Sequence, residues 1–96
     1  MHSNDTVFDA TNAEEFKFAL RQIFGVDEDS APDFYNPKQI FLFLLDRNVW
    51  HNFSVSYADG TTVMSFANKR LSISYTLASP NHNLFAKFRA YVNHTP

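Results

Sequence analysis

Two groups of carboxylates are the side chains whose type and spacing could support chemistry. Glu14 and Glu15 are adjacent, and a second acidic run, residues 27–29, is followed by Asp33. Paired carboxylates can serve as general acid and base or bind a cation. The first pair falls where a helix is expected to begin, and the helix dipole favours negative charge there. The second run lacks the D-x-[DN]-x-[DN]-G spacing of a calcium loop, so we interpret it as a solvated loop that can contact a partner.

The sequence excludes most other catalytic and cofactor chemistry. Cysteine is absent, which removes thiol catalysis, cysteine-ligated zinc and disulfide bonds. The histidines are dispersed without the spacing of a zinc site, no serine lies in a G-x-S-x-G motif, and two glycines are too few for a phosphate-binding loop. We therefore predict a protein that is not an enzyme, with no catalytic residue, no metal and no cofactor.

Charge and hydropathy also restrict the partners and the location. Eight of the ten acids precede Pro37, whereas six of the eight bases follow it, so the chain has an acidic and a basic part. The bases are scattered in ones and twos, which makes nucleic acid an unfavoured partner. The first residues do not resemble a signal peptide, and no apolar run approaches the about 18 residues of a membrane span. We expect no membrane contact, and we predict a soluble cytoplasmic protein.

One helix is predicted in the first third of the chain. The segment Thr11-Asn12-Ala13-Glu14 has the pattern of a capping box, with Thr11 as the cap and Glu14 reaching back. Apolar residues then recur at helical spacing up to Gly25, which can adopt the left-handed conformation that ends a helix. Residues 26–36 lack periodicity and are read as a loop, and residues 1–10 are expected to be a flexible N-terminus.

A period of two residues from position 49 to 77 predicts an antiparallel meander. Asp59-Gly60 is typical of a two-residue hairpin turn, and it would place Tyr57 opposite Thr62 and Phe53 opposite Phe66. A third strand, residues 71–77, follows. Two segments are less clear: residues 40–45 read as a first strand in preference to a helix that begins after Asn36, and residues 84–92 show helical spacing. The predicted fold is a single α+β domain over residues 1–96, with an N-terminal helix, a meander of three to four strands and a C-terminal helix in two layers.

The side of the meander that faces away from the helices is a candidate contact surface. Ser54, Ser72 and Ser74 are expected to point outward there, and Trp50 has the same parity. If residues 40–45 form a strand, their apolar side chains join Trp50 in a patch of the kind that marks protein contacts.

These features lead to three hypotheses for the function. The first is a small non-catalytic protein-binding module, an inhibitor or regulator of the type of bacterial immunity proteins or phage-encoded anti-defence inhibitors. It would cover a site on a partner protein, for example a nucleic-acid-handling enzyme, by presenting carboxylates where phosphates bind. The second is a structural or regulatory homodimer that uses the outer sheet face, and the third is a nucleic-acid-binding accessory protein. The candidate partner-binding residues are Asp27, Glu28, Asp29, Asp33, Trp50, Ser54, Ser72 and Ser74.

Overall fold

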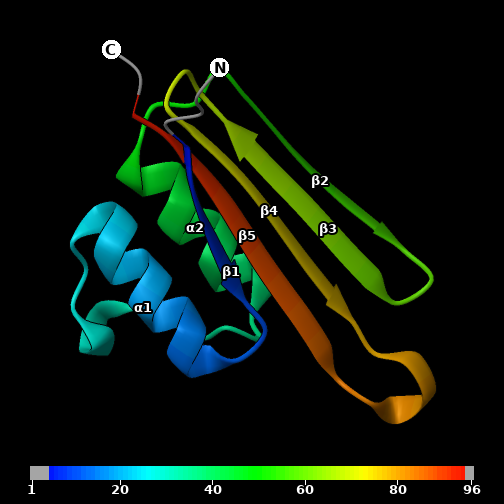
Figure 1. Cartoon of the computed structure of the whole chain (residues 1–96). Helices are drawn as coiled ribbons and strands as arrows, with labels where there is room; N and C mark the ends of the chain where they lie inside the picture. Colours follow the sequence, from blue (N-terminus) through cyan, green and yellow to red (C-terminus); the bar gives the residue numbers. More distant parts are fainter. Residues whose placement is uncertain (1–4, 95–96) are drawn as a thin grey trace.

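The chain folds as an α+β structure with a five-stranded antiparallel sheet and two helices on one of its faces (Figure 1). The computed structural model describes residues 5–94. The strands are β1 (Asp5–Ala10), β2 (Asn52–Ala58), β3 (Thr61–Ala67), β4 (Leu71–Ala78) and β5 (Phe85–Asn93). The helices are α1 (Ala13–Phe24) and α2 (Pro37–Arg47), with short 3₁₀ turns η1 (Glu28–Ser30) and η2 (Pro80–His82). The strand order is β1-β5-β4-β3-β2, so β1 and β2 are the two edges. The α+β class with an antiparallel sheet is confirmed.

Helix α1 begins one residue later than the sequence suggested. Asn12, not Thr11, is the N-cap, and its side-chain oxygen accepts a hydrogen bond from the backbone N–H of Glu15 at 2.9 Å. Glu15, not Glu14, reaches back and accepts from the Thr11 N–H at 2.9 Å. The cap is therefore one residue later than predicted, and Glu15 bonds the N–H of Thr11 instead of the N–H of the cap residue that a capping box uses. The predicted end is confirmed, because Gly25 has φ 69° and donates its N–H to the Arg21 carbonyl at 2.9 Å.

The preference for a strand at residues 40–45 is wrong, because these residues lie in α2. Asn36 caps this helix by accepting from the Gln39 N–H at 3.1 Å, and Pro37 occupies its first turn. Ile40 and Leu44, one helical turn apart, are fully buried against the sheet. The helix forms because Asn36 and Pro37 favour a helix start locally, whereas the spacing within the uninterrupted apolar run favours neither a helix nor a strand.

The predicted C-terminal helix is also wrong. Residues 85–93 form β5, a central strand that pairs with both β1 and β4. The inward side chains of β5 alternate large and small: Phe88 is buried between Ala86 and Ala90. Because alanines fill two inward positions, the alternation is hidden in the sequence. A spacing of three and four residues among Phe85, Phe88 and Val92 then imitates a helix.

The expectation of a flexible N-terminus is corrected over residues 5–10, while residues 1–4 lie outside the described part of the chain. Residues 5–10 form β1, which pairs antiparallel with β5 in a register that joins Asp5 to Asn93 and Ala10 to Phe88. Ala10 is fully buried. The polar composition of this segment suits an edge strand that has few inward positions to fill.

The register of the predicted meander is confirmed, but its first strand begins at Asn52 instead of residue 49, and β5 continues the meander beyond β4. Asp59 and Gly60 both have positive φ, 54° and 76°, as a type I′ turn requires. Tyr57 lies opposite Thr62 and Phe53 opposite Phe66. Strand β4 continues the arrangement, since Phe66 lies opposite Ile73.

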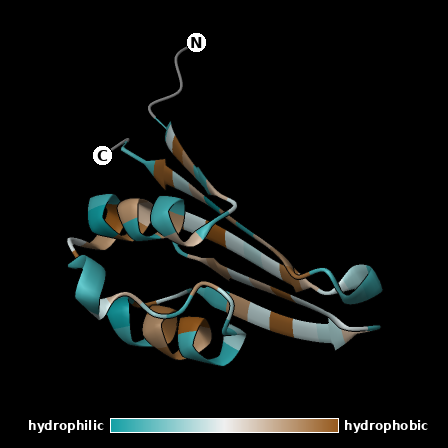
Figure 2. Ribbon diagram, turned by 90° about the horizontal axis from the view of Figure 1, so that it is seen from below, coloured by the Kyte–Doolittle hydropathy of each residue, from teal (hydrophilic) through white to brown (hydrophobic). Residues whose placement is uncertain are grey.

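The core lies between the helices and the sheet, and α2 contacts β2 through Phe41 and Phe53 without burying that strand. Phe16 of α1 contacts Phe34 and Phe88, with ring centroids 4.9 and 5.0 Å apart. Figure 2 shows both helices on the same side of the sheet and alternating hydropathy along the strands. All seven residues of β2 are exposed. The sheet is therefore wider than the helical layer that covers it.

Candidate binding surfaces

The outer face of the sheet carries the hydroxyl groups that the sequence placed there. Ser54, Ser72 and Ser74 are all exposed, and Ser54 Oγ lies 2.9 Å from Ser65 Oγ across the β2–β3 pair. Near β1 the outer face carries charged side chains instead of hydroxyl groups. There Arg89 donates two hydrogen bonds to Asp9, from Nε at 2.5 Å and from Nη2 at 3.1 Å.

Trp50 does not belong to this outer face, so the prediction of a tryptophan-centred patch is wrong. Its indole N–H donates to the Leu44 carbonyl at 2.7 Å, and its ring lies 5.2 Å from that of Phe66 on the helix side. The chain bends at His51 before β2 begins, so the alternation of the strand does not extend back to Trp50. Residues 40–45 are absent from this face as well because they are helical.

The acidic loop is divided between two shallow hollows. Glu28, Asp29 and Asp33 line one of about 360 Å³ beside Lys17 and Phe16. Asp27 lines another of about 270 Å³ that also includes Arg47. Asp33 has a local structural role, because its carboxylate accepts the Tyr35 N–H at 3.0 Å in an Asx turn before α2. Asp27, Glu28 and Asp29 are exposed and remain available to a partner.

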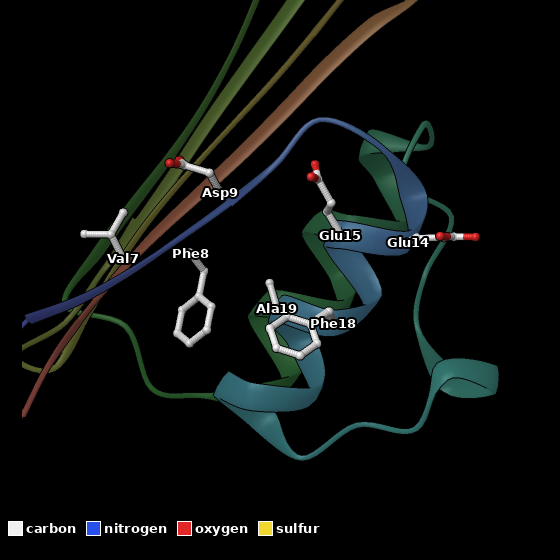
Figure 3. Close-up of a pocket in the computed structure, with 7 residues that line it drawn as sticks. All are labelled: Val7, Phe8, Asp9, Glu14, Glu15, Phe18 and Ala19. Atoms are coloured by element: carbon white, nitrogen blue, oxygen red, sulfur yellow. The ribbon is translucent and has the colours of Figure 1, made fainter.

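A third hollow, of about 450 Å³, lies between α1 and β1 (Figure 3). Its lining combines apolar and acidic side chains: Val7, Phe8, Asp9, Glu14, Glu15, Phe18 and Ala19. In the close-up the Phe8 ring points into the space beside the helix, whereas Glu14 points away from it.

Two of the three carboxylates of this hollow, those of Asp9 and Glu15, already have partners in the fold. Arg89 holds the pKa of Asp9 below its usual value through a charged hydrogen bond, and the pKa of the Arg89 guanidinium is raised in return. Glu15 accepts from the backbone and hydroxyl of Thr11. The arrangement therefore suits a structural role better than the binding of a cation. Within residues 5–94, no group of three or more His, Asp or Glu side chains is arranged to hold a metal ion.

The sequence did not reveal the surface along β2. Phe53, Val55 and Tyr57 point to the helix side of the sheet as predicted, yet their exposed fractions are 48, 50 and 73%. We call these three side chains the β2 strip. The ring of Phe53 contacts the ring of Phe41 in α2, and the two centroids lie 5.8 Å apart.

An apolar groove adjoins the β2 strip. It has a volume of about 330 Å³, and its walls come from the start of α2 and from β2 and β3: Pro37, Lys38, Phe41, Val55, Thr62 and Met64. Its lining is apolar except at Lys38 and Thr62. The signal that could have located this surface is the absence of any charged residue between His51 and Asp59, which leaves the strand with none of the usual protection of a sheet edge.

Among the described residues, no helix is both long enough and apolar enough to cross a membrane. Comparison of the chain with protein-family models, with curated proteins and with solved structures finds no match in any of the three.

Proposed function

We propose that the chain is a cytoplasmic, non-catalytic protein-binding module that inhibits or regulates a partner protein by covering a site on it. The type is that of bacterial immunity proteins and phage-encoded anti-defence inhibitors. The single observation that carries the proposal is the β2 strip beside its apolar groove. In this proposal the β2 strip and the groove are the principal contact surface.

The exposure of the β2 strip supports this role because it is contiguous. Single exposed apolar residues are common on protein surfaces, whereas a connected group usually marks a contact. Phe53, Val55 and Tyr57 are successive residues of one face of one strand, and the groove extends the apolar surface toward Phe41. Aromatic side chains are also enriched among the residues that contribute most to binding.

The open edge of β2 adds a second means of binding. Strand β2 pairs with β3 on one side, and no strand of the described sheet lies on its other side. An extended segment of a partner can add to such an edge through backbone hydrogen bonds, while side-chain pockets give specificity. The groove between α2 and β3 is placed to receive an apolar side chain of that segment.

The acidic loop supports the inhibitory part of the proposal. Glu28 and Asp29 are exposed and line a shallow hollow. Their carboxylates can bind a basic site of the partner protein that otherwise binds phosphate. A homodimer through the outer sheet face is the less favoured alternative, since Trp50 does not contribute to that face. Nucleic-acid binding is favoured only by the outward alternation of Phe85, Lys87 and Tyr91 along β5, where Arg89 is already paired with Asp9.

Site-specific photo-crosslinking in cells of the native host tests the proposal. The photoreactive residue p-benzoylphenylalanine replaces Tyr57 on the β2 strip and, in a matched control, Ser72 on the outer face. Both positions are exposed, so neither replacement disturbs the core. We expect a discrete covalent protein adduct from position 57 and none from position 72. Adducts from position 72 alone would favour the outer-face alternative, and no adduct from position 57 would overturn the proposal.

A further inference from the structure

We infer that the occupant of the β2 strip is a second copy of this chain, paired through β2 in antiparallel orientation about a two-fold axis at Val55. The inference rests on the proposed function because it uses the same contact surface, and it identifies the protein that is covered and regulated through that surface as another copy of this chain. The result is one antiparallel sheet that continues through both protomers. A two-fold axis perpendicular to the sheet keeps the helices of both protomers on the same side.

The backbone of β2 has the hydrogen-bonding groups that this pairing needs. In a type I′ turn at Asp59-Gly60, the residues that flank the turn, Ala58 and Thr61, form a hydrogen-bonded pair. Such pairs alternate along an antiparallel ladder, so the N–H and C=O groups of Phe53, Val55 and Tyr57 face the open edge. A two-fold axis at Val55 lets these groups bond to the same groups of the second copy.

The side chains of β2 are complementary to themselves in this register. With Val55 opposite Val55 of the second copy, Phe53 lies opposite Tyr57 and Ser54 opposite Ser56. Apolar residues therefore meet apolar residues on the helix side, and hydroxyl groups meet hydroxyl groups on the outer side. The apolar side chains of both copies fill the space between the two α2 helices. All seven residues of β2 take part in the pairing.

The charges near the strand favour the same arrangement. Strand β2 contains no charged residue and no proline, whereas the opposite edge, β1, carries Asp5 and Asp9. Charge on an edge strand is a common protection against self-pairing. Asp59 follows the last residue of β2 and His51 precedes the first, so antiparallel pairing brings each Asp59 toward His51 of the second copy. Each end of the junction thereby places an imidazole, which can donate a hydrogen bond, beside a carboxylate, which can accept one.

The area of the contact sets the expected strength. Covering the exposed parts of Phe53, Val55 and Tyr57 removes roughly a few hundred Å² per protomer, less than the about 800 Å² per partner of a typical stable interface. We therefore expect a reversible dimer whose population depends on concentration. The measurement must extend to high protein concentration, on the order of 1 mM.

Sedimentation equilibrium of the purified chain is the first test. The expected mass rises from that of the 11.1 kDa monomer toward twice that value as the concentration increases. Val55→Lys places two ammonium groups together at the two-fold axis and should raise the dissociation constant roughly 100-fold or more. Ser72→Lys, on the outer face, adds the same charge and should leave it unchanged. A monomer at every concentration, or equal effects of both variants, would overturn the inference.

Disulfide formation is the second test, and the cysteine-free chain makes it clean. Hydrogen-bonded antiparallel partners have Cα atoms about 5.5 Å apart, within the range that a disulfide can span. Val55→Cys should give a covalent dimer on mild oxidation. Tyr57→Cys should not, because its two copies lie four residues apart along the strand. Rapid linkage of Tyr57→Cys with none of Val55→Cys would contradict the proposed register.

The two proposals can fail separately. If the purified chain stays monomeric while position 57 forms an adduct with a different protein in cells, the second copy is ruled out and the protein-binding role stands. If position 57 forms no adduct and Val55→Cys no disulfide, both proposals fail. Circular dichroism of Val55→Lys, whose side chain is half exposed, should match that of the unmodified chain and show that the fold is retained.

Discussion

Among single residues, Tyr75 fixes the loop before α2 to the sheet. Its hydroxyl donates to the Phe34 carbonyl at 2.6 Å, and the two rings lie 6.0 Å apart. Burial raises the pKa of the Tyr75 phenol well above its usual value, and the negative charge of Asp33 adds to the shift. The neutral form that donates this hydrogen bond is therefore the one present in the folded state at neutral pH.

Replacing Tyr75 with Phe should lower the free energy of unfolding by about 1–2 kcal/mol, because the buried Phe34 carbonyl loses its donor while the ring packing is retained. Urea denaturation monitored by circular dichroism measures the change. Tyr57→Phe is the matched control, since that side chain is 73% exposed and its hydroxyl should contribute close to nothing. Equal losses in the two variants would show that the hydroxyl of Tyr75 is not structural.

The same residue gives a pH dependence of known sign. In the unfolded chain Tyr75 ionises near pH 10, whereas in the folded chain its pKa is higher. Its stabilising contribution is therefore complete below about pH 10 and declines as the pH rises above that value. Stability should fall more steeply with pH above 10 in the unmodified chain than in Tyr75→Phe. Parallel curves would contradict this assignment.

At the scale of the elements, the N-terminus of α1 offers a direct comparison of two adjacent caps. Asn12→Ala removes the acceptor for the Glu15 N–H and should cost about 1 kcal/mol of stability. Thr11→Ala should cost less than half of that, because the exposed Thr11 hydroxyl contributes a single hydrogen bond to Glu15 and its backbone N–H is retained. Thermal unfolding measures both variants. A larger loss for Thr11→Ala would restore the cap register expected from the sequence.

Elements with local signals could be predicted from the sequence, and those that depend on distant partners could not. The end of α1 at Gly25 and the hairpin at Asp59-Gly60 follow from the backbone preferences of a few neighbouring residues. Strand β5 owes its conformation to pairing with β1 and β4, which the sequence around Phe88 does not encode. Asn36 and Pro37 favour the helical interpretation of α2, which is the correct one. The prediction of a strand gives too much weight to the apolar run of residues 40–45.

At the scale of the whole molecule, the sequence predicts which face of the sheet a side chain lies on, but not whether a helix covers that side chain. The sequence correctly assigned Val55 to the helix side and Ser54 to the opposite side. Whether a helix covers Val55 depends on the width of the sheet relative to the helical layer, and β1 and β5 add strands that were not expected. The helices cover the middle of the five strands, which leaves β2 exposed.

The charge distribution across the molecule supports a test of the acidic loop. Figure 1 places η1 and β2 on opposite sides of the structure. Changing both Asp27 and Asp29 to Lys should alter the free energy of unfolding by less than about 0.5 kcal/mol, since both side chains are exposed. The same change should weaken capture of a different partner protein in a pull-down from the native host, and it should leave the dissociation constant of the β2-paired dimer unchanged because η1 lies on the opposite side from β2. Unchanged capture would remove the acidic loop from the proposed contact.

The pairing of β1 with β5 has a consequence for synthesis on the ribosome. The first strand of the described chain adjoins the last, with Asp5 opposite Asn93, so β1 has no neighbouring strand until β5 has left the ribosome. The sheet cannot close before then, and its longest-range contacts form last. Such contacts slow folding because a long loop must close first. In the interval α1 can shield part of β1, while the β2–β3 hairpin, already complete, exposes its apolar edge to other nascent chains.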